Sequence, residues 1–156
     1  MKVIALTFSG GHVGIMRIVR EAANVEEQIQ KFEAVNPQTV ISWREISEEE
    51  LPIECKKGNR EFRNALVDRA GKLEIDMPKA RNLHREHLRT LRAPLLAALD
   101  INFQRADELG DAAEKSRIAR LKQALRDVTE APGIEAAQTP EALKSVLPEI
   151  LNASRQ

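Results

Sequence analysis

One sharp break, Leu109-Gly110-Asp111, interrupts a stretch from Met77 to Val128 that is otherwise helical in pattern. Before the break, apolar and small residues follow the alternating three and four spacing of a coiled-coil seam at Leu88, Leu91, Leu95, Ala98 and Asn102. A second stripe runs beside it at Leu96, Leu99, Phe103 and Ala106. After the break, the matching seam is Ile118, Leu121, Leu125 and Val128. Because only a tight turn joins the two segments, the pattern predicts an antiparallel helical hairpin.

The ends of this hairpin have recognisable signals. Asp76 is placed to cap the first helix, and Pro78 fits its first turn. Gly110 is placed at the C′ position that ends the first helix, and Asp111 with Glu114 forms a cap for the second. Pro94 lies inside the first helix, so we expect a kink or break near residues 90–93.

The N-terminal part is predicted to be a small α+β unit. A β-prone run ends at Phe8, and Ser9-Gly10-Gly11 supplies a turn before residues 12–19 continue, which predicts a β-hairpin. Asn24 is placed to cap a helix through Val35 that Asn36-Pro37 stops. Residues 39–46 predict a half-buried strand with Ile41, Trp43 and Ile46 on one face.

Three further segments complete the prediction. Ser47 to Glu50 has capping-box spacing and indicates a short helical turn, and residues 53–60 indicate an exposed connection. Residues 62–67 and 72–75 are expected to be two strands joined by a four-residue loop. Residues 129–137 have no lasting period, Thr139 caps a short last helix, and the end from Asn152 is expected to fray.

The chain is therefore expected to be an α+β protein in three parts. These are a small α+β domain at 1–76, the helical hairpin at 77–128, and a C-terminal loop with a short helix at 129–156. No run of apolar residues approaches the length of a membrane span, and the N-terminus lacks the features of a secretion signal. We expect a soluble protein made without a secretion signal.

Charge and cysteine content narrow the possible functions. Lys plus Arg and Asp plus Glu both number 24, so no global field attracts nucleic acid or an anionic membrane. Cys55 is the only cysteine, which excludes an internal disulfide and a thiol-based zinc site. No cofactor-binding motif or paired catalytic carboxylates are present, and an enzyme is not expected.

The strongest local charge is a row of arginines on the first long helix: Arg81, Arg85, Arg89 and Arg92. Between residues 78 and 92 there are five Lys or Arg residues against one acid, Glu86. Spacings of four, four and three place the arginines on one face, where they could bind phosphates or the carboxylates of a partner. The alternative is a solvated face opposite the leucine seam, paired with acids of the N-terminal unit.

Other candidate sites are weaker. His84 and His87 could share a metal ion, but no further ligand lies nearby, so two solvent-facing histidines are expected and no metal. The glycines near His12 lack the ending of a phosphate loop and are explained by a turn. Cys55 is followed by two lysines but has no assignable base, and it is interpreted as a spectator.

Several motifs are shared with a known family of proteins. They are Phe62-Arg63-Asn64-Ala65, Asp76-Met77-Pro78-Lys79-Ala80-Arg81, His84-Arg85, Arg92-Ala93-Pro94-Leu95, Leu99-Asp100, Arg105-Ala106, Gly110-Asp111, Lys122-Gln123-Ala124-Leu125-Arg126-Asp127 and Thr139-Pro140-Glu141-Ala142-Leu143-Lys144. In these motifs, covering about residues 60–150, the chain resembles a family of small bacteriophage and prophage proteins. The block from Lys122 to Asp127 is similar to the C-terminal part of phage tail-fibre assembly proteins.

The resemblance implies a virion or tail-assembly role and supplies no catalytic residues. We therefore expect a structural component of the virion, associated with the tail or tail fibre, that binds other phage structural proteins and forms a homo-oligomer or symmetric assembly. One alternative is a tail-fibre assembly chaperone that leaves before maturation. Another, possible but not favoured, is a nucleic-acid-binding module that uses the arginine face of residues 81–92.

Overall fold

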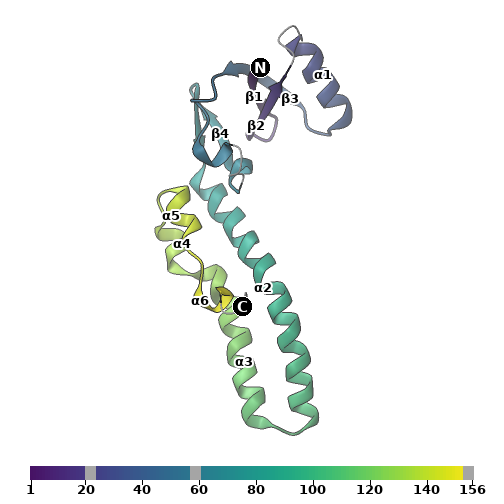
Figure 1. Cartoon of the computed structure of the whole chain (residues 1–156), viewed down its shortest axis with the longest axis vertical. Coiled ribbons are helices and arrows are strands. Elements are labelled where there is room, and N and C mark those ends of the chain that lie inside the picture. The colour runs from purple at the N-terminus through teal and green to yellow at the C-terminus, as the bar shows by residue number, and fades with distance from the viewer. Residues whose placement is uncertain (20–23, 57–60, 153–156) are drawn as a thin grey trace. The chain divides into compact units, whose positions relative to one another are not determined.

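The computed structural model describes residues 1–19, 24–56 and 61–152, and it confirms an α+β chain. The chain divides into two compact units, unit 1 at Met1–Ala80 and unit 2 at Arg81–Gln156. Unit 1 contains, in order, β1 (Lys2–Phe8), β2 (Val13–Ile18), α1 (Val25–Val35), β3 (Val40–Ile46), η1 (Ile53–Cys55), η2 (Arg63–Ala65), β4 (Leu66–Arg69) and β5 (Lys72–Ile75). The long helix α2 (Met77–Glu108) starts at the end of unit 1 and continues through unit 2 (Figure 1).

Unit 1 is built on a three-stranded antiparallel sheet of order β2-β1-β3. The apolar run of β1 is buried on both faces, because successive side chains of a strand point to opposite sides. Ile4, Leu6 and Phe8 belong to a core with Val25 and Ile29 of α1. On the other face, Val3 and Ala5 belong to a second core with Val13, Ile46, Leu51, Cys55, Leu66 and Leu73. The predicted hairpin of β1 and β2 is confirmed.

Local signals place α1 as predicted. The side chain of Asn24 accepts a hydrogen bond from the amide of Glu27 at 3.2 Å, which satisfies one of the open amides of the first turn. The helix ends before Asn36, whose amide donates to the carbonyl of Glu33. The carboxylate of Glu33 accepts from the amide of Val40 at 2.8 Å, so the helix end is tied to the start of β3.

The predicted faces of β3 are wrong in one respect. Ile46 is buried, whereas Ile41 and Trp43 are 63% and 40% exposed. The ladder between β1 and β3 shifts register between Thr7 and Phe8, so Ile41 is left out of the one-to-one pairing. Ile46 pairs with Val3 and Trp43 pairs with Leu6, so their odd spacing of three already places these two side chains on opposite faces of the sheet.

The connection after β3 is less open than predicted. Ser47 and Glu50 make the reciprocal hydrogen bonds of a capping box, but these residues form a turn, and the next helix, η1, begins only at Ile53. Within the predicted exposed connection, η1 brings Cys55 into the core. Residues 57–60, the last four of that connection, lie outside the described residues.

The hairpin of β4 and β5 is confirmed, with two corrections. Its turn is two residues long, since Ala70 and Gly71 both have positive φ angles, at 53° and 88°. This pair of angles belongs to a type I′ turn, which matches the twist of paired strands. The segment before β4 is the short 3₁₀ helix η2 and not a strand, and Phe62 beside it is fully buried.

Helix α2 begins at the predicted cap and runs without the predicted break. The carboxylate of Asp76 accepts from the amide of Lys79 at 3.0 Å. Pro94 lies inside the helix, and the helix is continuous from Met77 to Glu108. Both Pro94 and Thr90, one turn earlier, are exposed, so water can solvate the carbonyl that proline leaves without a donor.

In unit 2, α2 and α3 (Ala112–Asp127) form the predicted antiparallel hairpin (Figure 1). Gly110 has a φ of 66°, and its amide donates to the carbonyl of Asp107. The amide of Asp111 donates to the carbonyl of Ala106 at 2.9 Å, which completes a Schellman motif. The Asp111 carboxylate then accepts from the amide of Glu114 and caps α3.

The predicted seam of α2 is partly wrong. Leu88 is fully buried, but Ala98 and Asn102 at the end of that seam are exposed. On the second stripe, Phe103 is half-buried and Ala106 is buried. The buried face drifts from the first stripe to the second, because a helix of 3.6 residues per turn does not keep a 3.5-residue repeat.

The C-terminal segment is more structured than predicted. It contains η3 (Val128–Glu130), α4 (Pro132–Ala136), α5 (Pro140–Lys144) and α6 (Glu149–Asn152), beside the end of the hairpin opposite its turn (Figure 1). Thr139 caps α5 as predicted, accepting from the amide of Ala142. Asn152 ends α6, and the last four residues lie outside the described part of the chain. None of the described helices combines the length and apolar content needed to cross a membrane.

Candidate interaction surfaces

The first two arginines of the predicted face are bound inside unit 2. The guanidinium of Arg81 donates to the carbonyl of Ile134 at 3.1 Å and to that of Ala137 at 2.9 Å. Its side chain is 17% exposed. Arg85 donates to the carbonyl of Thr129 at 3.3 Å and pairs with the carboxylate of Glu135. These contacts connect α2 to a segment about fifty residues later in the chain.

The third inward arginine caps a helix end. Arg92 donates to the carbonyls of Leu125 and Arg126 in the last turn of α3, where open carbonyls and the helix dipole favour a cation. Arg89 differs, because it is more exposed and pairs with Glu86 three residues earlier on the same helix. A partner could therefore reach Arg89 directly, whereas it would have to displace internal bonds to reach the other three.

The prediction that the arginines lie opposite the leucine seam is wrong. Arg85 and Arg92 stand three before and four after the buried Leu88, which places all three side chains on one face of the helix. Arg81, Arg85 and Arg92 therefore belong to the packed side of α2. Glu135, the acid that pairs with Arg81 and Arg85, lies in α4 and not in the N-terminal unit.

The prediction that His84 faces solvent is wrong, because its side chain is buried and only 2% exposed. Its Nε2 lies 2.9 Å from the carbonyl oxygen of Val146, so this nitrogen carries the proton and donates to the carbonyl. His87 is exposed, and the two ring centroids are 6.5 Å apart. Within the described residues, no three His, Cys, Asp or Glu side chains are grouped to hold a metal ion.

Charged side chains link the two helices in the distal part of the hairpin, residues 93–124. Lys122 pairs with Asp100, and Lys115 pairs with Asp107 across the two helices. Both ammonium groups also approach the ring of Phe103, at 5.2 Å for Lys122 and 5.6 Å for Lys115. Such exposed pairs and cation–π contacts each stabilise by about 1 kcal/mol or less.

Apolar burial in this distal part is small. Ala106 and Ile118 are its two buried residues. Ile101 is 53% exposed and Leu109 is 83% exposed, with Ala97 and Ala98 also exposed on α2. A hairpin of two helices has no third layer to cover its outer faces, and here one of those faces is weakly apolar.

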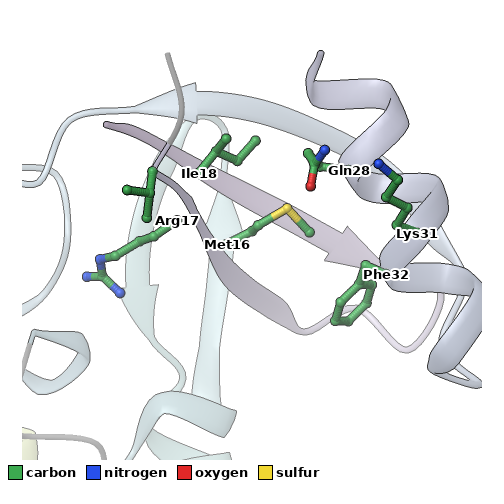
Figure 2. Close-up of a pocket in the computed structure, with 7 residues that line it drawn as sticks. Met16, Arg17, Ile18, Gln28, Lys31 and Phe32 are labelled. Carbon is green, nitrogen blue, oxygen red and sulfur yellow. The ribbon is translucent and has the colours of Figure 1, made fainter. Parts of the chain in front are cut away.

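Unit 1 contains a groove beside β2. It consists of two adjoining hollows of about 540 Å³ each, which share Met16, Arg17 and Phe32. Figure 2 shows Met16 from β2 together with Phe32 and Lys31 from α1 around the first hollow, with Arg17 directed to the other side of the strand. The second hollow extends past His12 to η2, where Arg63 and Asn64 line it.

Three ion pairs fix side chains of the sheet in unit 1. Arg17 donates to Glu48 at 2.8 Å, and this hydrogen bond lowers the pKa of Glu48 and raises that of Arg17. Arg44 of β3 binds both Glu50 and Asp68, each at 2.8 Å. Its hydrogen bond lowers the pKa of Glu50 below the usual range of a glutamate. These pairs tie the sheet to the segments that cover its second face.

Cys55 and the glycine loop have structural surroundings. Cys55 is 8% exposed and packs in the second core of unit 1. Gly11 has a φ of 70° in the turn between β1 and β2, as the turn interpretation requires. Gly14 is needed for space, because a Cβ there would lie 2.7 Å from the ring of Phe8.

Comparison with models of protein families, with curated proteins and with solved structures found no match to this chain.

Proposed function

We propose that the chain is a non-enzymatic structural protein of a bacteriophage virion, associated with the tail or tail fibre, that joins phage proteins to one another. The observation that supports this best is the distal hairpin. Between residues 93 and 124 it buries only Ala106 and Ile118, and it leaves Ile101 and Leu109 exposed. Such a surface is suited to a second protein layer, supplied by a copy of the chain or a neighbouring component. The resemblance of residues 60–150 to small phage proteins supplies the virion context.

The arginine row gives less support to a nucleic-acid-binding role. Three of its guanidinium groups donate hydrogen bonds to backbone carbonyls within unit 2, namely those of Arg81, Arg85 and Arg92. A phosphate backbone would need several such groups exposed together.

The test is quantitative mass spectrometry of purified particles from a phage or prophage that encodes the chain, measured against the major capsid protein. A small fixed copy number per particle is expected. Absence from particles, with abundant protein in the infected cell, would refute the structural role and favour an assembly chaperone.

Variants of the hairpin sharpen the test. Ile101→Lys places a charge on the weakly apolar face of α2, and Ser116→Lys places the same charge on exposed α3. Losing one apolar interface anchor costs about 2 kcal/mol or more, so Ile101→Lys should reduce incorporation by at least about tenfold. Equal incorporation of both variants would show that this face does not dock.

A further inference from the structure

We propose that the open edge of β2 and its groove bind an extended acidic peptide, which adds to the sheet as a fourth strand. The site lies wholly in unit 1. The proposal goes beyond the assembly role of the hairpin and does not depend on it.

The first argument is the direction of the backbone N–H and C=O groups of β2, which alternate along the strand between β1 and the open edge. The amide of Phe8 donates to the carbonyl of His12 at 3.0 Å. In an antiparallel ladder hydrogen-bonded pairs alternate, so Leu6–Gly14 and Ile4–Met16 are bonded pairs. The backbone groups of Ile15 and Arg17 therefore point away from β1. Across the described residues no strand pairs with this edge, and no turn or side chain bonds those groups.

The second argument is the shape of the surface beside this edge. The groove follows β2 between Phe32 of α1 on one side and Asn64 of η2 on the other. Met16 and Phe32 provide apolar contacts, while the backbone edge provides donors and acceptors in a row. An added strand uses both, because its backbone bonds the edge and alternate side chains enter the hollows.

The third argument is charge. Among the described residues that line the groove there are three cations, Arg17, Lys31 and Arg63, and no carboxylate. Arg17 and Lys31 have partners just outside the lining, Glu48 and Glu27. Arg63 has no ion pair within the described part of the chain, so it is the group most available to a carboxylate of the ligand.

The opposite edge of the sheet provides a control. By the same alternation, the backbone N–H and C=O groups of Trp43 and Glu45 in β3 point outward, away from β1. Neither hollow of the groove borders that strand. A peptide that bound any open strand edge would bind there equally well, whereas the proposed site predicts a preference for β2.

The test measures binding of a fluorescein-labelled nonapeptide of alternating Val and Glu to the full chain by fluorescence polarisation at low salt. A peptide of alternating Val and Lys should bind at least about tenfold more weakly, because it meets cations instead of pairing with them. Arg17→Pro removes an outward N–H without removing a ladder bond, and it should abolish binding. Glu45→Pro makes the same change on β3 and should leave binding intact.

Charge variants and amide shifts complete the design. Arg63→Glu should weaken binding about threefold to tenfold, while Arg120→Glu, the same charge change on α3, should have no effect. In the unmodified chain, NMR amide signals of Ile15 and Arg17 should shift on addition of the Val–Glu peptide, which tests the site even if a proline variant fails to fold. A Kd weaker than about 1 mM, equal binding of the lysine peptide, or shifts confined to β3 would overturn the proposal.

Discussion

Arg81→Ala tests how much the hydrogen bonds of the arginine row contribute to the stability of unit 2. The substitution removes two hydrogen bonds from a guanidinium that is 17% exposed, to the carbonyls of Ile134 and Ala137. Bonds to charged groups stabilise by about 1.5–3 kcal/mol each, and water will re-solvate part of what is lost. We therefore expect a loss of about 2 kcal/mol. For a unit of this size, that corresponds to a fall in Tm of roughly 8–16 °C.

The assay is thermal unfolding followed by two signals. Circular dichroism at 222 nm reports mainly the helices of unit 2, and fluorescence reports unit 1, because Trp43 is the only tryptophan. Arg89→Ala is the matched control, since Arg89 is 44% exposed and pairs only within its own helix. We expect the control to cost at most about 0.5 kcal/mol. Equal losses for the two variants, or a loss seen only by Trp43, would refute the reasoning.

Three further predictions concern packing, pH and a turn. Leu88→Ala should destabilise unit 2 by about 2–5 kcal/mol in urea unfolding, whereas Ile101→Ala should change stability little, because Leu88 is fully buried and Ile101 is not. Glu50 has a folded pKa below the ordinary value of 4.5, so its stabilisation is present above pH 4.5 and is lost as pH falls through the folded pKa. Arg44→Met should therefore flatten the acid limb of a stability–pH profile of unit 1. Ala70→Gly should raise Tm, with a gain of up to about 1–2 kcal/mol, because Ala70 has a φ of 53°.

Sequence patterns predicted best those features that rest on neighbouring residues. The caps at Asn24, Asp76, Asp111 and Thr139 are confirmed, and each bonds an amide three residues later. Their geometry is local, so the spacing of residue types contains the information. The hairpin turn at Gly110 was predictable for the same reason.

Predictions failed where the answer depends on distant residues. The roles of Arg81 and His84 depend on carbonyls of Ile134 and Val146, more than fifty residues away, and carbonyls have no signature in a sequence. One local signal was missed, the placement of Arg85 and Arg92 around Leu88 at helical spacing. The groove beside β2 was not predicted, because it needs the positions of α1 and η2 relative to the strand.

The long-range arginine contacts set an order for folding during synthesis. The hairpin of α2 and α3 joins neighbouring segments through a tight turn, so it can form once residue 128 has left the ribosome. Arg81 and Arg85 must wait for carbonyls of residues 129–137, which are made later. Until then, the guanidinium groups of Arg81 and Arg85 lack their internal partners and are accessible to an acidic partner. That accessibility ends when the C-terminal helices pack against α2.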